Sequence, residues 1–122
     1  GVEVLGFVDD LQPVWQQTTA LVAPIRSGTG TRIKIIESFA RGVAVVSTTL
    51  GCDGLDVVPE EHLLVGDDPA AFAERCCRVI ADPALRTRLV RAGRVLAERH
   101  HSPAAFEATV AELAGRAEAA AP

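Results

Sequence analysis

Two short, unbroken runs of apolar residues are the strongest constraint on how this chain folds. They cover residues 20–23 and 43–46, and a segment with helical spacing, 31–41, lies between them. Unbroken apolar runs of this length are typical of strands that are buried on both faces of a parallel sheet. The order strand, helix, strand therefore predicts an α/β fold: a partial Rossmann-like domain whose parallel sheet is flanked by helices.

The helix between the two runs has an apolar side that we expect to face the sheet. Ile33, Ile36 and Ala40 fall on one face at helical spacing, and Ile35 and Phe39 lie beside it. A helix at the surface of a globular domain packs through such a stripe. These residues therefore predict the surface through which the helix contacts the sheet.

Weaker signals predict the remaining elements. Strands are marked by β-branched and other apolar residues, and helix starts by proline or by an aspartate or serine cap. The predicted elements are strands at 2–7 and 63–65 and helices at 11–18, 69–81, 83–100 and 103–115. We accordingly assign residues 1–116 to one domain and the low-complexity residues 117–122 to a disordered tail.

The start of the chain predicts that it is a fragment of a longer protein. Its 122 residues contain no Met, and a predicted strand begins almost at Gly1 with no lead-in. We therefore expect the domain to be truncated at its N-terminal side.

The charge and the hydropathy pattern exclude several classes of protein. The net charge of −4 gives no basic face for a nucleic acid. No apolar run approaches the roughly 20 residues that span a bilayer, and the start of the chain does not resemble a signal peptide. These features predict a cytoplasmic protein, with the inner face of the membrane as an alternative for the full-length molecule.

A glycine-rich turn followed by a helix is the candidate binding site. Gly28 and Gly30 would let the backbone of the loop 26–31 approach a ligand closely. The amino end of the next helix offers free N–H groups and a positive dipole, which suit a phosphate. Glu37, about two turns into that helix, carries a carboxylate that would accept hydrogen bonds from the vicinal hydroxyls of a ribose. Together these features predict a nucleotide site.

Four segments carry a pattern that resembles one known family. They are residues 4–11, 22–24, 28–48 and 51–55. In order and spacing they are similar to the group 1 family of retaining glycosyltransferases, over roughly residues 2–65. The resemblance implies the GT-B architecture, in which two Rossmann-like domains enclose the active site and the C-terminal domain binds the nucleotide-sugar donor. It implies that this chain is the C-terminal half of that second domain.

The resemblance also implies roles for individual residues. Glu37 matches the second glutamate of the family's paired-glutamate motif, which binds the ribose hydroxyls. Gly28, Thr29 and Gly30 match the loop near the diphosphate and the donor sugar, and Lys34 lies in their neighbourhood. Thr29 stands where the family has its first glutamate, so it supplies no negative charge near a developing oxocarbenium ion.

Simpler interpretations of the same side chains exist. Glu37 and Arg41 have the spacing of an ordinary helix ion pair, worth about 0.3–0.5 kcal/mol. Lys34, Arg26 and Thr31 are candidate residues for binding the nucleotide-sugar donor. The alternative for Lys34 and Arg26 is that they are ordinary solvated side chains. The two glycines have an alternative as a plain turn.

The function predicted for the full-length protein is sugar transfer from a nucleotide-diphosphate donor to an unidentified acceptor. This fragment alone is expected to be inactive, because the acceptor domain and the basic residues that grip the diphosphate lie outside it. No residue of the chain is assigned a catalytic role. No cofactor is implied, and no metal, since an Asp-x-Asp motif is missing from the sequence.

Rival interpretations remain at this stage. A sugar-nucleotide epimerase shares the same architecture, and a non-catalytic α/β module would use the fold to bind another protein. The predicted partners are the donor and the N-terminal acceptor domain of the same protein. A homodimer through an exposed sheet edge is a further alternative.

Overall fold

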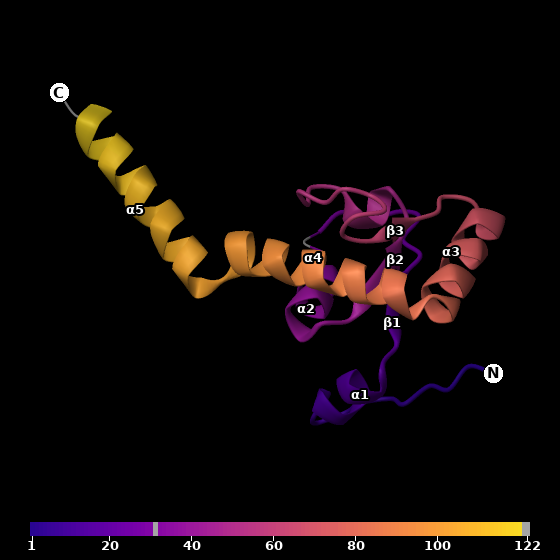
Figure 1. Ribbon diagram of the computed structural model, residues 1–122. Helices are drawn as coiled ribbons and strands as arrows, with labels where there is room; N and C mark the ends of the chain where they lie inside the picture. Colours follow the sequence, from indigo (N-terminus) through magenta and orange to yellow (C-terminus); the bar gives the residue numbers. More distant parts are fainter. Residues whose placement is uncertain (31, 121–122) are drawn as a thin grey trace.

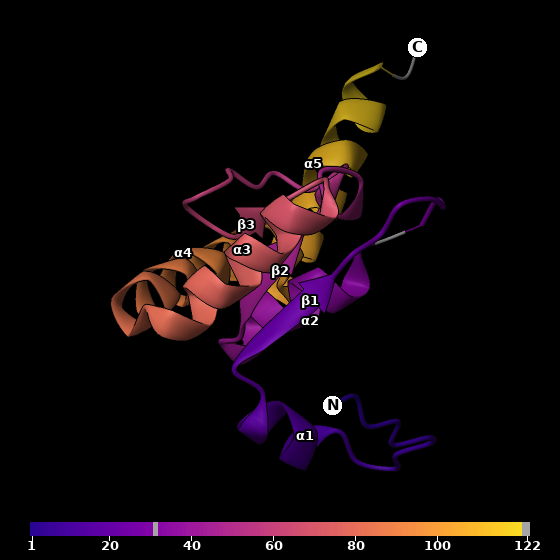
Figure 2. The same cartoon turned by 90° about the vertical axis from the view of Figure 1, so that its right-hand side faces the viewer.

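The computed structural model describes residues 1–30 and 32–120. The strands are β1 (Ala20–Ala23), β2 (Ala44–Ser47) and β3 (Leu64–Val65). The helices are α1 (Gln12–Gln17), α2 (Ile33–Arg41), α3 (Pro69–Ala81), α4 (Pro83–His101) and α5 (Pro103–Ala120), with a 3₁₀ turn, η1, at Leu50–Cys52. Figures 1 and 2 show the strands at the centre of a body formed with α2, α3 and α4, from which α1 and α5 project.

The three strands form one parallel sheet in the order β1-β2-β3. Ala23 at the end of β1 pairs with Ser47 at the end of β2, and Ser47 pairs in turn with Val65 of β3. The prediction of a parallel α/β sheet flanked by helices is therefore confirmed. Residues 20–23 were expected to be fully buried, and here the prediction is wrong. β1 has a partner on one side only, and Val22 is 51% exposed.

The core lies on both faces of β2, whose four residues are all buried. Successive side chains of a strand point to opposite faces. Val45 packs with Ile35 and Phe39 of α2, whereas Val46 packs with residues of α3 and α4 such as Leu89. The helix α4 contributes residues to both clusters. It therefore connects the cores on the two faces of the sheet within one domain.

The apolar side of α2 is rotated relative to the prediction. The buried residues are Ile35, Ser38 and Phe39, while Ile33 and Ala40 are exposed. The polar Ser38 is accommodated because its hydroxyl donates a hydrogen bond to the Lys34 carbonyl at 2.7 Å. A local hydrogen bond of this kind satisfies a serine inside the core, so the buried face includes Ser38 and centres on Ile35 and Phe39, which were placed beside the predicted stripe.

Residues 2–7 do not form the predicted strand. They are extended coil, and Phe7 is 91% exposed. A strand is stabilised by ladder hydrogen bonds to a neighbour, and this segment lies beside α1, away from the sheet (Figure 1). The segment therefore has β-forming residues without a strand to pair with. The short helix predicted after it is present as α1, and Asp10 accepts a hydrogen bond from the Gln12 N–H at 2.9 Å.

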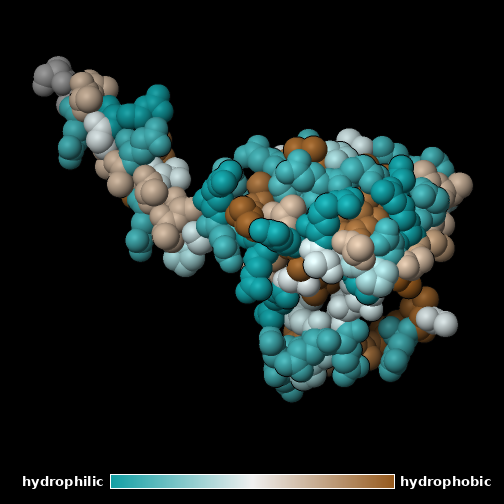
Figure 3. All heavy atoms as spheres, viewed as in Figure 1, coloured by the Kyte–Doolittle hydropathy of each residue, from teal (hydrophilic) through white to brown (hydrophobic). Residues whose placement is uncertain are grey.

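The later helices begin where their caps predict. The Asp68 side chain accepts hydrogen bonds from the first turn of α3, Asp82 does so for α4, and Ser102 does so for α5. The helix α5 continues through Ala120, so residues 117–120, expected to be a tail, are helical. Residues 121–122 lie outside the described part. Figure 3 shows α5 as an arm that leaves the body of the molecule.

Within residues 1–30 and 32–120, no helix is both long and apolar enough to cross a bilayer.

The contact between α4 and α2 predicts how two glycines respond to substitution. A Cβ at Gly93 would lie 2.5 Å from the buried Phe39 ring, whereas one at Gly115 of α5 would meet no atom within 4 Å. We expect Gly93→Ala to lower the free energy of unfolding by about 1–3 kcal/mol through overpacking. Gly115→Ala should raise it by up to about 1 kcal/mol through helix propensity. Urea unfolding of both variants measures this, and equal stability of the two would contradict the packing described.

Candidate functional site

The candidate site lies at the carboxyl edge of the sheet, where three connections leave the strands. The first loop, 24–32, follows β1, the second loop, 48–55, follows β2, and residues 66–68 follow β3. Parallel sheets bind their ligands at this edge, because the loops there lead into helix amino ends. The structure therefore places the predicted glycine-rich loop, together with the second loop beside it, where a ligand of this fold would bind.

Side-chain hydrogen bonds tie the first loop to the second. The Thr48 hydroxyl donates to the Ile25 carbonyl at 2.6 Å, and Nη2 of Arg32 donates to the Leu50 carbonyl at 2.8 Å. Gly51 lies so close that a Cβ there would collide with the Ser47 hydroxyl and lie 3.0 Å from the Ala23 carbonyl. The two loops are thus held in a fixed relation at the base of the site.

The connection after β3 adds a carboxylate to the same edge. Asp67 accepts hydrogen bonds from both the N–H and the hydroxyl of Thr49, each at 2.7 Å. These two hydrogen bonds hold the pKa of Asp67 below its ordinary value of 3.8, and the backbone N–H has a larger effect than the hydroxyl. Because hydrogen bonds to the charged form favour it, Asp67 is ionised at neutral pH and anchors the second loop.

A buried thiol lies in the second loop. Burial is the main reason why the pKa of Cys52 is raised above its ordinary value of 9.0. The thiolate is the reactive form of cysteine, so burial disfavours that form of Cys52.

The glycine-rich part of the first loop is open to solvent. Gly28 and Gly30 have φ angles of +112° and +149°, which only glycine adopts readily, and a Cβ at either would meet nothing within 4 Å. Arg26 and Thr29 are exposed beside them. Thr31, a further candidate ligand, lies outside the described residues. The two glycines are therefore required by the backbone conformation, and the space next to them is empty.

The amino end of α2 lies directly after this loop. The N-cap residue Arg32 makes no side-chain capping hydrogen bond, and its carbonyl accepts from the N–H groups of Ile35 and Ile36. The N–H groups at the start of a helix have no intrahelical partner, and the helix dipole makes that end favourable for an anion. The loop and the helix end together present backbone donors to solvent.

Glu37 lies on the flank of α2 between two basic side chains of the same helix. One carboxylate oxygen is 3.4 Å from Nζ of Lys34 and the other is 3.1 Å from Nε of Arg41. Arg41 also donates to the side chain of Gln12 and lies over the Trp15 ring at 5.4 Å. The ordinary helix ion pair with Arg41 is thus present, and α1 supports it. The Glu37 side chain is still 26% exposed.

The structure brings only some of the predicted residues together. Glu37 lines a groove of about 640 Å³ with Ile33 and Ile36 of α2 and with Phe106 of α5. The loop residues 26–30 do not line this groove. The candidate ligands therefore form two groups, one at the carboxyl edge of the sheet and one along α2, with Lys34 exposed between them.

Two functional candidates were missed from the sequence. Arg32 joins the two loops, and its Nε atom is buried without a partner among the described residues. Asp67 joins the second loop to the end of β3. A signal for Asp67 was available, because a carboxylate directly after the predicted strand 63–65 falls at the same sheet edge. No sequence pattern indicated the hydrogen bond from Arg32 to the Leu50 carbonyl, because the two residues are 18 positions apart.

Comparisons with known proteins identify the family of the chain. A family model described as "Glycosyl transferases group 1" matches residues 1–82. The chain is also similar to an uncharacterized 44.6 kDa protein in the cps region of Klebsiella pneumoniae. The two are 26% identical over 66 residues, which cover 54% of this chain and 17% of that protein. The chain thus matches a small part of the length of this curated relative.

The contact between Asp67 and Thr49 predicts a measurable acid titration. A carboxyl whose pKa is depressed in the folded state contributes stability above its ordinary pKa of 3.8 and loses it as the pH falls through the folded value. We expect NMR titration to place the Asp67 pKa below 3.8 and Thr49→Val to raise it only partly, since the backbone donor remains. Thr109→Val on α5 serves as the control and should leave it unchanged. An Asp67 pKa at or above 3.8 in the native chain would refute the contact.

Proposed function

Because this chain belongs to the group 1 glycosyl transferases, we propose that it binds the nucleotide-diphosphate sugar from which the full-length enzyme transfers a sugar. The observation that carries this proposal is the pairing of an open glycine loop with the uncapped amino end of α2. That pairing supplies backbone donors for phosphate oxygens in a position that side chains leave empty.

The diphosphate is proposed to lie against Gly28 and Gly30, at the start of α2. Both glycines have room around them, so phosphate oxygens approach the backbone without displacing a side chain. Arg26 and Lys34 are exposed on either side of the loop and supply positive charge. Arg32, tied to the second loop, keeps that side of the site in place.

The ribose is proposed to lie against Glu37. A carboxylate offers about four acceptor positions, and the ion pairs with Lys34 and Arg41 occupy only part of them. These two cations also hold the rotamer of Glu37, which reduces the entropy lost when a ligand binds. The ion pair and the ribose contact are therefore compatible roles for one side chain.

Thr29 is proposed to contact the donor sugar through its hydroxyl. It is exposed in the loop between the two glycines. A hydroxyl donates or accepts a hydrogen bond, but it carries no charge to stabilise a positive transition state. Charge stabilisation at the sugar and at the leaving diphosphate would then come from parts of the full-length enzyme beyond these residues. On this proposal the chain alone binds the donor and does not transfer the sugar.

Nucleotide binding to the 122-residue chain tests the proposal. We expect ligand-observed NMR to detect binding of one of UDP, GDP and ADP in preference to the others. Glu37→Gln should weaken that binding by about 10-fold or more, because hydrogen bonds to charged groups contribute about 1.5–3 kcal/mol. The matched control is Glu98→Gln, which removes a carboxylate from another i,i+4 ion pair, with Arg94 of α4.

The outcomes of this experiment separate the alternatives. Selective binding that is lost in Glu37→Gln and kept in Glu98→Gln supports the donor site. Absence of binding for all three nucleotides, or the same loss in both variants, would contradict it and favour a module that uses the fold to bind another protein.

A further inference from the structure

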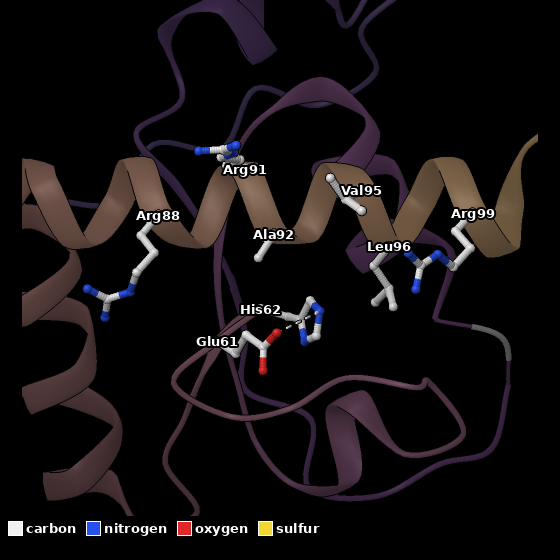
Figure 4. A pocket seen from close by; sticks show the side chains of 8 residues that line it. All are labelled: Glu61, His62, Arg88, Arg91, Ala92, Val95, Leu96 and Arg99. Atoms are coloured by element: carbon white, nitrogen blue, oxygen red, sulfur yellow. Dashed lines mark ion pairs between the residues drawn. The ribbon is translucent and has the colours of Figure 1, made fainter.

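A basic groove runs along α4 on the side that faces residues 61–62. It has a volume of about 430 Å³. Its lining from α4 consists of three arginines and three apolar residues: Arg88, Arg91, Arg99, Ala92, Val95 and Leu96. Figure 4 shows Arg88 and Arg99 toward the two ends of this row and His62 opposite its middle. The groove shares no lining residue with the groove that holds Glu37, so it is a separate feature of the surface.

The arginines of α4 differ in what they contact. The helix carries five arginines and one glutamate, although the chain as a whole has a net charge of −4. Arg86 donates hydrogen bonds to two carbonyls at the end of α3, and Arg94 pairs with Glu98 at 3.5 Å. The three arginines of the groove are exposed, and within residues 1–30 and 32–120 none of them forms an ion pair. Their positive charge is therefore available to a ligand.

The opposite wall of the groove is held in place by hydrogen bonds and an ion pair. Nδ1 of His62 accepts a hydrogen bond from the Val58 N–H at 3.0 Å, which leaves the proton of the neutral ring on Nε2 as a donor. The strained residue Glu60, with a φ of +67°, is tied to Arg78 of α3 at 2.7 Å. Among the described residues that line the groove, Glu61 alone is acidic, and it is largely exposed. The groove is thus basic, and its wall is already in position for a ligand.

The spacing of the arginines determines the shape of ligand that fits. Arg88 and Arg99 lie about 16 Å apart along the helix axis, a distance that a single phosphate or carboxylate does not span. A flat membrane surface fits poorly as well, because Ala92 and Leu96 are half-buried at the bottom of the groove. An extended peptide advances about 3.3 Å per residue, so about five residues cover the distance. The groove therefore suits a short extended segment with acidic ends and an apolar middle.

We propose that this groove binds an acidic peptide segment of a partner protein in an extended conformation. Carboxylates near the two ends of the segment contact Arg88 and Arg99, because a guanidinium group matches a carboxylate in charge and geometry. An apolar side chain between them covers Val95, which is 49% exposed and so offers apolar surface to be removed from water. The inference is independent of the proposed function, because it uses neither the glycine loop nor Glu37.

A fluorescently labelled peptide tests the proposal. The probe carries a pair of glutamates, then alanine, leucine and alanine, and then a second pair of glutamates. Fluorescence anisotropy measures its binding to the 122-residue chain. We expect saturable binding that weakens at high salt, because exposed charge pairs contribute to it. The same peptide with glutamine in place of each glutamate should bind roughly 10-fold more weakly, since the charge pairs are lost.

Charge reversal in the protein locates the site. Arg88→Glu with Arg99→Glu should raise the peptide Kd by roughly 10-fold or more, because two exposed attractive pairs become repulsive. The matched control is Arg94→Glu with Arg116→Glu, which makes the same change in net charge outside the groove and should alter the Kd by less than about 3-fold. All four arginines are exposed, so the fold should survive, and circular dichroism verifies this.

Two further variants separate the apolar contact and the nucleotide site. Val95→Ser should weaken binding of the leucine peptide by about 3-fold or more, and it should have little effect on a peptide with serine in place of the leucine. Glu37→Gln should leave the peptide Kd unchanged, because Glu37 does not line this groove. Failure of this proposal and failure of the proposed function are thus distinguishable.

Several results would overturn the proposal. They are a native chain that does not bind the acidic peptide, equal binding of the glutamine peptide, and equal weakening in the two double variants. Vesicles that contain an anionic phospholipid form the last arm of the experiment. If the chain bound these vesicles and not the peptide, and Arg88→Glu with Arg99→Glu abolished that binding, the groove would belong to a membrane-binding surface instead.

Discussion

The burial of β2 is the constraint on which the rest of this structure depends. All four of its residues are buried, and it has a parallel neighbour on each side. Its backbone groups are thus satisfied by the sheet, while Val45 and Val46 pack against helices on opposite faces. Full burial of a valine contributes about 1.5–3 kcal/mol, and β2 gains this once on each face, at Val45 and at Val46. The positions of α2, α3 and α4 follow from it.

The carboxyl end of β2 converts this packing into a candidate site. Ser47 is buried at the end of the strand. The Thr48 hydroxyl donates a hydrogen bond to the first loop, and the Thr49 hydroxyl donates one to Asp67 after β3. These consecutive hydroxyl residues therefore join the three connections at the edge of the sheet. The second loop is held on both sides, whereas the glycine loop projects freely beyond it. A rigid base with an open backbone loop above it is an arrangement suited to a phosphate-bearing ligand.

The local features of the fold could be predicted from the sequence because local chemistry determines them. The apolar runs identified β1 and β2, and prolines with aspartate caps identified the starts of α3 and α4. Helices favour glycine just past their last turn, and Gly42 after α2 has the left-handed φ of +74° that this position requires. The glycine-rich turn between the first strand and the next helix was likewise expected, and it lies at the carboxyl edge of the sheet.

The features that the sequence did not predict depend on contacts between distant residues. The buried face of α2 is chosen by β2 and by Gly93 of α4, which gives the Phe39 ring its space. The strand expected at residues 2–7 lacks a neighbour, a property of the assembled sheet and not of the segment. The bonds Arg32–Leu50 and Thr49–Asp67 each join residues 18 positions apart. Neither propensity nor periodicity contains such information.

The central claim is that a nucleotide diphosphate binds at the glycine loop and the start of α2. Backbone ¹⁵N–¹H correlation spectra of the chain, recorded with UDP, GDP and ADP in turn, test it most directly. The account predicts that one nucleotide shifts the amide signals of Gly28, Gly30 and the first turn of α2, while those of residues 113–120, at the far end of α5, stay in place. Shifts confined to other parts of the chain, or none with any of the three nucleotides, would contradict it.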